Sequence, residues 1–243
     1  ALVLLGDIIA NAYQQAQLQM DVFQTKTVSV GDLFVGALIP GLLLVGMYII
    51  YLLVYARLRP EAAPPANQEK ADTGALIMGL LPPIALIVVV LGSILAGAAT
   101  PTEAAGIGAM GALLLAYARG QMDLQRLREA VTNTMEVTSM VFLILIGAAV
   151  FSLVFRGFGG EELIQGFFVD MPGGVMGATL VVMLAIFLLG FILDFIEITF
   201  VVVPIVGPIL LAMGLDPIWL GVVIALNLQT SFLTPPFGFA LFY

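Results

Sequence analysis

The residues best able to do chemistry in this sequence interrupt its most apolar stretch. Asp194 and Glu197, followed by Thr199, lie between apolar runs that cover about residues 175–193 and 198–213. An ionisable group in lipid costs free energy unless it is paired or solvated, so by default it marks an ion or substrate path. The structural alternative is that Asp194 caps a helix beginning at 195 and Glu197 completes a capping box. Both can hold, because a cap at a hairpin tip can also bind a cation.

A second polar group lies near the end of the chain. Its members are Asn227, Thr230, Ser231, Thr234, Pro235, Pro236 and Gly238. Each proline lacks an N–H, so the carbonyls one turn earlier lose their helical donors. These carbonyls and the three hydroxyls form a neutral oxygen cluster, and unwound backbone of this type coordinates Na⁺ in transporters. The alternative is a proline kink whose carbonyls are satisfied by hydroxyls of the same helix.

A third break, at residues 97–105, has the residues of a helix start. Thr100 is a suitable N-cap, Pro101 suits the first helical position, and Glu103 completes a capping box. We interpret this break as structural. Gly106, Gly108 and Gly111 follow and predict close packing against a neighbouring helix.

The composition defines the medium in which these groups sit. Hydrophobic residues make up 61% of the 243 residues and charged residues 10%, which one soluble core cannot accommodate. The chain has no Cys and no His, so disulfides, thiolate chemistry and the usual zinc and haem ligand sets are excluded. A net charge of −8 argues against binding to nucleic acid.

An all-α polytopic membrane protein is therefore expected. The sequence predicts spans over 33–55, 75–98 and 137–155, a shorter apolar run over 104–118, and further apolar runs over 175–193, 198–213 and 218–233. It also predicts an exposed loop at 11–30, a mobile linker at 60–73, and an amphipathic helix at 121–136 along the membrane interface. Arg57, Arg59 and Arg119 fall on one side, which the positive-inside rule makes cytoplasmic. Because both ends of the chain are apolar, we expect both to be cut within membrane-embedded segments.

The stretch 175–213 admits two arrangements. Its 39 or so residues are enough for two crossings of about 20 residues each. Alternatively, a re-entrant hairpin places its tip near the midplane of the membrane. The turn around Asp194 contains no Gly, Asn or basic residue, which favours the re-entrant hairpin.

Four segments carry a family resemblance. They are VSVGDLFVGALIPGLLL (28–44), GAATPTEAAGIGA (97–109), FILDFIEITFVVVPIVGPIL (191–210) and GLDPIWLGVVIALNLQTSFLTPPFGFALF (214–242). Together they resemble the large membrane subunit of tripartite ATP-independent periplasmic (TRAP) transporters, in the expected order and over nearly the whole chain.

The resemblance implies an elevator-type transporter with inverted repeats, each holding a re-entrant hairpin and a discontinuous helix. Residues 1–74 would comprise the end of the first repeat, a spanning helix and the cytoplasmic linker, and residues 75–174 the scaffold or arm helices. Residues 175–243 would form the second repeat's hairpin, with its tip near 194–197, and its broken helix, with the break near 230–238. The first repeat's hairpin and break would precede this chain.

The resemblance also implies Na⁺-coupled import of organic anions, usually carboxylates, across the bacterial inner membrane. A periplasmic substrate-binding protein would deliver the substrate and a small TRAP membrane subunit would brace the large one, with no enzyme activity. No cofactor beyond Na⁺ as coupling ion and no transition metal is expected. The expected cation-binding residues are Asp194, Thr230, Ser231, Thr234, Pro235 and Gly238, and the expected substrate-binding residues are Glu197, Thr199, Asn227 and Thr234.

Three alternatives stay open. One is a conventional Na⁺- or H⁺-coupled carboxylate symporter that needs no binding protein. Another is an intramembrane metal-dependent enzyme, in which Asp194 and Glu197, three residues apart, share one helical face as a carboxylate pair. The last is a purely structural membrane scaffold.

Overall fold

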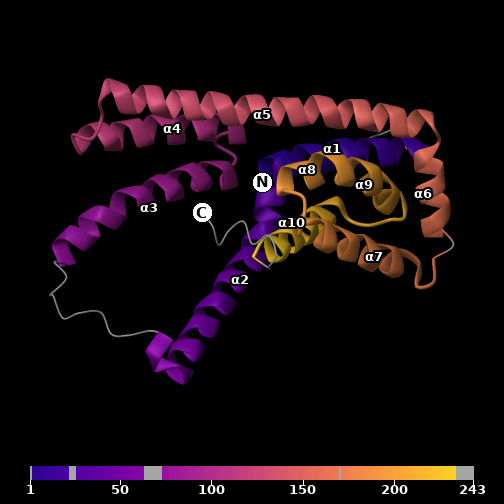
Figure 1. Ribbon diagram of the computed structural model, residues 1–243, viewed down its shortest axis with the longest axis horizontal. Coiled ribbons are helices and arrows are strands. Elements are labelled where there is room, and N and C mark those ends of the chain that lie inside the picture. The colour runs from indigo at the N-terminus through magenta and orange to yellow at the C-terminus, as the bar shows by residue number, and fades with distance from the viewer. Residues whose placement is uncertain (1, 22–25, 63–72, 170, 234–243) are drawn as a thin grey trace. The chain divides into compact units, whose positions relative to one another are not determined.

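A computed structural model describes residues 2–21, 26–62, 73–169 and 171–233, and all regular structure in these ranges is helical (Figure 1). The longer helices are α1 (Leu2–Gln19), α2 (Val30–Leu58), α3 (Thr73–Leu95), α4 (Pro101–Ala118), α5 (Leu124–Gly157), α6 (Gly160–Val169), α7 (Gly174–Leu189), α9 (Val203–Ala212) and α10 (Pro217–Phe232). Three short elements complete the series: the 3₁₀ turn η1 (Pro60–Ala62), the helical turn α8 (Phe195–Glu197) and the π-helical turn η2 (Ile198–Val202).

Four helices among the described residues are long and apolar enough to cross a membrane. They are Val30–Leu58, Leu76–Leu95, Leu124–Gly157 and Phe195–Ala212. The first three agree with the spans predicted over 33–55, 75–98 and 137–155. The fourth differs from them, because 61% of it is buried within the protein, against 0–6% for the others. It is therefore a core element, and the other three present their apolar side chains outward.

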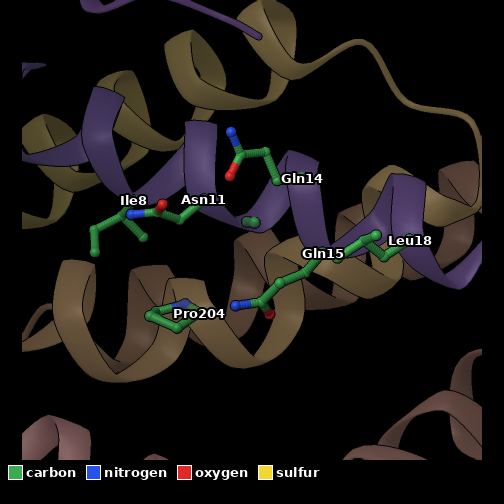
Figure 2. Close-up of a pocket in the computed structure, with 7 residues that line it drawn as sticks. Ile8, Asn11, Gln14, Gln15, Leu18 and Pro204 are labelled. Atoms are coloured by element: carbon green, nitrogen blue, oxygen red, sulfur yellow. The ribbon is translucent and has the colours of Figure 1, made fainter. Parts of the chain in front are cut away.

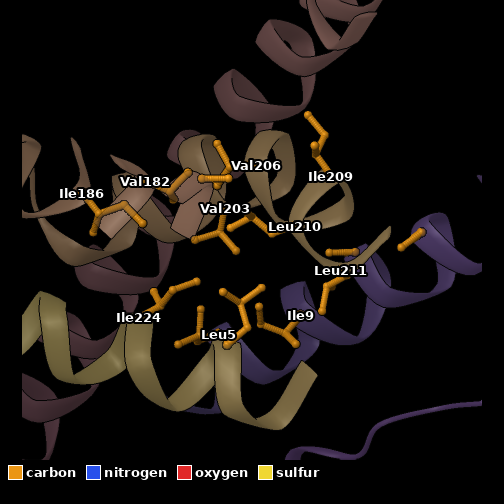
Figure 3. Packing of buried hydrophobic residues seen from close by; sticks show 14 of the residues in the cluster. Leu5, Ile9, Val182, Ile186, Val203, Val206, Ile209, Leu210, Leu211 and Ile224 are labelled. Carbon is orange, nitrogen blue, oxygen red and sulfur yellow. The ribbon is translucent and has the colours of Figure 1, made fainter. Parts of the chain in front are cut away.

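The chain divides into two compact units, residues 1–33 with 129–243 and residues 34–128. The core of the first unit is built from α1, α7, α9 and α10 (Figure 3). Its fully buried side chains include Ile9 of α1, Ile186 of α7, Leu210 of α9 and Ile224 of α10. α1 packs along α9 and also contacts α10, and α10 in turn contacts α7. Apolar residues on either side of Asp194 are thus packed in one hydrophobic core.

The predicted loop at 11–30 is wrong over its first half. α1 continues to Gln19, and Ala12, Ala16 and Gln17 are buried in the core. Leu5, Ile9, Ala12 and Ala16 recur at helical spacing and form one apolar stripe, and α1 packs along α9. The four glutamines and one asparagine of this segment suggested a loop by composition, whereas its periodicity indicates a helix.

The amphipathic segment 121–136 and the following span form one element. α5 runs without interruption from Leu124 to Gly157, a length of 34 residues. Thr134, in the amphipathic part, donates its hydroxyl proton to the Ala130 carbonyl at 2.7 Å, within the helix. The placement of residues 121–136 at a membrane interface stays a prediction.

In the second unit, α3 and α4 form a closely packed hairpin. A β-carbon at Gly111 would overlap the Leu86 side chain, and one at Gly108 would lie 3.3 Å from a Val90 methyl. The packing predicted for these two glycines is confirmed, while Gly106 faces open space. Small residues therefore bring the two helix axes close together at these positions.

The predicted helix start at Thr100 is also confirmed. Pro101 opens α4, the Glu103 amide donates to the Thr100 hydroxyl at 3.4 Å, and the Thr100 amide donates to the Glu103 carboxylate at 2.8 Å. The Thr100 hydroxyl donates to the same carboxylate oxygen at 2.8 Å. Backbone and hydroxyl donors both stabilise the charged form of Glu103.

This capping box leads to a prediction about acidity. The amide of Thr100, and then its hydroxyl, lower the pKa of Glu103 from the ordinary glutamate value. A carboxylate with a lowered pKa in the folded state stabilises the fold above its unfolded pKa and loses that contribution as pH falls through the folded value. We expect Thr100→Val, which removes the hydroxyl donor, to raise the pKa of Glu103, as measured by infrared titration of a ¹³C-labelled glutamate carboxyl. An unchanged titration would contradict the role given to the hydroxyl.

Candidate functional site

The carboxylates of Asp194 and Glu197 lie where α7 gives way to the next helix. α7 ends at Leu189, the chain turns through residues 190–193, and Asp194 adopts an extended conformation as the N-cap of α8. Ile196 and Ile198 are buried on either side of Glu197, at 7% and 0% exposure, and fix this turn to the core. Both carboxylates are half-buried.

The structure shows the capping box that the sequence suggested here. The Phe195 amide donates to Oδ1 of Asp194 at 2.7 Å, and the Asp194 amide donates to Oε2 of Glu197 at 3.3 Å. A carboxylate has about four lone-pair positions, more than the box requires. The two acidic groups are therefore positioned by backbone N–H donors and retain capacity for a further ligand.

Thr199 lies one turn beyond the cap, in the π-helical turn η2. The side chain is 1% exposed, and the turn closes with a bond from the Val203 amide to the Ile198 carbonyl, five residues earlier. Single π-turns occur frequently at functional sites, because the extra residue changes where side chains point. Asp194, Glu197 and Thr199 thus form one group within six residues.

α10 carries the second set of residues. Asn227 donates from Nδ2 to the Met183 carbonyl of α7 at 2.7 Å, which ties these two helices together. The Thr230 hydroxyl donates to the Asn227 carbonyl at 2.7 Å and to the Leu226 carbonyl at 3.3 Å. These two carbonyls are not the ones that Pro235 and Pro236 deprive of donors, which belong to residues 231 and 232, so the kinked-helix alternative stays open.

Part of the predicted cation set lies outside the described residues. Thr234, Pro235 and Gly238 belong to this part, and Ser231 is described only as a residue of α10. The break predicted near 230–238 therefore stays a prediction. Among the described residues, no three or more acidic side chains gather in one place to hold a metal ion.

Sequence reasoning missed the glutamines of α1. Gln17 is 3% exposed, and its side-chain amide pairs with the backbone of Lys26, accepting from N at 2.6 Å and donating to O at 2.9 Å. Gln15 accepts from the Arg156 guanidinium at 3.2 Å, and the same guanidinium forms an ion pair with Glu161 at 2.8 Å. The helical spacing of these residues, rather than their polarity, was the signal that could have revealed them.

Three polar side chains of α1 line a cavity of about 330 Å³ against α9 (Figure 2). Asn11, Gln14 and Gln15 provide its amide groups, and Pro204 forms the opposite wall. This cavity lies beside the buried Phe195–Ala212 helix. The predicted site residues are not among those that line it.

Comparison with known proteins identifies the family. The description "Tripartite ATP-independent periplasmic transporter, DctM component" matches residues 17–243, nearly the entire chain. The chain belongs to this DctM family. Several curated relatives are named as TRAP transporter permeases, which are not enzymes. The alternative of an intramembrane enzyme therefore has no support.

Three relatives of the DctM family show the extent of the match. The chain is 29% identical over 218 residues to the C4-dicarboxylate TRAP transporter large permease protein DctM of Pseudomonas aeruginosa, covering 88% of the chain and 50% of that protein. It is 28% identical over 218 residues to the sialic acid TRAP transporter large permease protein SiaM of Vibrio cholerae, with coverage of 88% and 50%. It is 29% identical over 218 residues to the ectoine/5-hydroxyectoine TRAP transporter large permease protein UehC of Ruegeria pomeroyi, with coverage of 89% and 51%. The chain spans about half the length of these curated relatives.

Proposed function

We propose that this DctM chain is part of a permease that imports organic anions by secondary transport coupled to Na⁺. Membership of the family supports transport, and two of the relatives are named for C4-dicarboxylates and sialic acid, which are carboxylates. The complete protein would lie in the bacterial inner membrane. It would work with a small TRAP membrane subunit and a periplasmic substrate-binding protein, as the words "tripartite" and "periplasmic" in the family description suggest.

The observation that carries the proposal is the pair of carboxylates held by a capping box inside an apolar unit. Two negative charges this close to a buried helix are costly without a counter-charge. The two carboxylates are backbone-positioned and half-buried. A hard cation such as Na⁺ prefers oxygen ligands of this kind and would offset the charge. The helix N-terminus would at the same time direct partial positive charge toward an anionic substrate.

We further propose that residues 175–213 form a re-entrant hairpin with Asp194 at its tip. The lengths of the two arms support this arrangement. α7 has 16 residues, about 24 Å at 1.5 Å per residue, which is less than the hydrocarbon thickness of ~30 Å. The segment Phe195–Ala212 has 18 residues and is largely buried in the protein. Two short arms around a polar tip are the arrangement expected of an elevator-type transporter with discontinuous helices.

In this mechanism the coupling ion would bind first. Asp194, with the oxygen atoms of Thr230, Ser231, Thr234 and the carbonyls freed before Pro235, would surround Na⁺ near Gly238. Glu197, Thr199 and Asn227 would line the substrate site beside it. Neutralisation of Asp194 by Na⁺ would lower the cost of bringing in a carboxylate substrate, so ion and substrate binding would be coupled.

The experiment is substrate uptake into liposomes that hold the complete permease and its small subunit. Uptake is measured with and without a Na⁺ gradient, and with and without a candidate binding protein loaded with a C4-dicarboxylate. A requirement for both supports the proposal. Uptake that needs the Na⁺ gradient but not the binding protein would indicate a conventional symporter and overturn the role of the binding protein. Uptake that does not respond to the Na⁺ gradient would overturn the coupling to Na⁺.

A further inference from the structure

The prolines of α3 leave two backbone carbonyls without their usual donors. In a regular α-helix the amide of residue i donates to the carbonyl of residue i−4, and proline has no amide proton. Pro82 and Pro83 lie inside α3, so the two carbonyls affected are those of Met78 and Gly79. Both residues are exposed on a helix that is apolar enough to cross a membrane. In lipid, an unpaired carbonyl of this kind must be satisfied by some other protein group.

Arg119 provides a donor to these same two carbonyls. Its Nη2 atom lies 2.8 Å from the Met78 oxygen and 3.2 Å from the Gly79 oxygen. No general attraction between α3 and α4 would select these two acceptors over the other carbonyls of α3. The arginine therefore contacts the same two carbonyls that the prolines leave without donors, and this match is specific.

The end of α4 places the guanidinium at this position. Arg119 is the C-cap of α4, and Gly120 follows with a φ of +64°, a conformation that favours glycine and turns the chain away from the helix. Leu86 and Val90 of α3 lie against Gly111 and Gly108 of α4 and hold the two helices in register. A long arginine side chain at the end of α4 then reaches back along α3.

We propose that Arg119 replaces the two backbone donors that Pro82 and Pro83 lack, and so holds the proline-containing end of α3 against the end of α4. Arginine suits this role because its planar guanidinium carries five N–H donors and is always charged. Hydrogen bonds from a charged donor are stronger than those between neutral groups. The proposal is independent of the ion and substrate proposed above, because it concerns only contacts between α3 and α4.

The test is a double-mutant cycle in the complete permease with its small subunit, reconstituted in nanodiscs. The variants are Arg119→Met, Pro82→Ala with Pro83→Ala, and the three changes together. The alanines restore the amide protons, so the two carbonyls regain their helical donors. We expect Arg119→Met alone to lower Tm by about 2 °C or more, and the same change on the double-alanine background to lower it by less than half as much.

Two further variants separate this role from others. Arg128→Met removes a positive charge from α5 and should leave Tm unchanged. If Tm depended on positive charge in general, or on its attraction to anionic lipid, Arg128→Met would lower Tm as well. Arg119→Lys keeps the charge but has a shorter reach and a more strongly hydrated head group, and we expect it to recover only part of the loss. Hydrogen exchange of peptides covering 80–90 should become about tenfold faster in Arg119→Met as this end of α3 opens, and should not change in Arg128→Met.

The Tm values of these variants can support or overturn the role proposed for Arg119. An equal loss of Tm on both backgrounds, or no loss in Arg119→Met alone, overturns the proposal. Should Arg119→Met fail to fold by itself, its recovery on the double-alanine background supports the proposal. A failure to fold on both backgrounds overturns it.

Discussion

Asp194→Asn in the complete permease is expected to abolish or strongly weaken Na⁺-driven uptake while the protein stays folded. Asparagine caps a helix about as well as aspartate does, so the bond from the Phe195 amide is retained and only the negative charge is lost. If the carboxylate binds Na⁺, its removal should raise the half-saturating Na⁺ concentration about tenfold or more, equivalent to at least ~1.4 kcal/mol of binding free energy. Uptake into liposomes at varied Na⁺ concentration measures this directly.

Matched variants separate the charge of this group from its capping role. Glu197→Gln keeps an acceptor for the Asp194 amide and loses a charge, whereas Asp194→Ala loses charge and cap together. The alanine variant should also lose about 1 kcal/mol of stability. Wild-type Na⁺ dependence in Asp194→Asn would mean that the carboxylate is only a cap, and the proposed cation site would have to be abandoned.

The two capping boxes could be predicted from the sequence because helix caps are local. Thr100 with Glu103, and Asp194 with Glu197, each act within one turn of backbone, and the structure shows both boxes. The first three membrane spans could be predicted for the same reason, since a run of roughly 20 apolar residues suffices to identify each of them. Whether the second box also binds a cation depends on groups brought in from elsewhere in the chain, which a local pattern does not specify.

Features that depend on tertiary packing could not be predicted in the same way. Gln17 is buried because it pairs with the backbone of Lys26, nine residues away, and composition alone placed it in a loop. The resemblance implies a substrate role for Asn227, and no local pattern indicates that its amide also contacts the Met183 carbonyl, 44 residues away. The role of Arg119 likewise requires knowing that the end of α4 lies beside Met78. In each case a polar side chain has a partner outside its own helical turn, which a local pattern does not reveal.

Gly177→Ala is expected to be among the most destabilising single changes in the first unit. A β-carbon at this position would overlap the carbonyl oxygen of Pro172, which is backbone and cannot rotate away. The turn before α7 is already constrained, since Gly173 and Gly174 have φ values of +94° and +57°. Overpacking of this kind typically costs about 1–3 kcal/mol. Thermal unfolding of the complete permease should show a Tm lower by several degrees.

Gly106→Ala provides the control for this prediction. A β-carbon at Gly106 meets nothing within 4 Å, and alanine is favoured over glycine inside a helix by about 1 kcal/mol. This variant should therefore keep or slightly raise Tm. Equal Tm values for Gly177→Ala and Gly106→Ala would contradict the prediction, because they would show that the turn before α7 can shift to make room for the added β-carbon.

The π-helical turn over Ile198–Val202 has a consequence for orientation. In an α-helix each residue advances about 100° around the axis, and a π-turn holds one more residue than an α-turn does. If the same residues formed a regular α-helix, the two carboxylates would be rotated around the helix axis, relative to the buried face of α9, by about the angle that one residue contributes. The π-turn thus sets the angular position of Asp194 and Glu197 around the helix axis, relative to Val203 and Leu210, which are buried in the core. Deleting one residue within the π-turn can convert the turn to α geometry and keep the carboxylates in the same direction around the helix axis. A substitution that favours α geometry without changing the length of the chain must instead rotate the carboxylates around that axis.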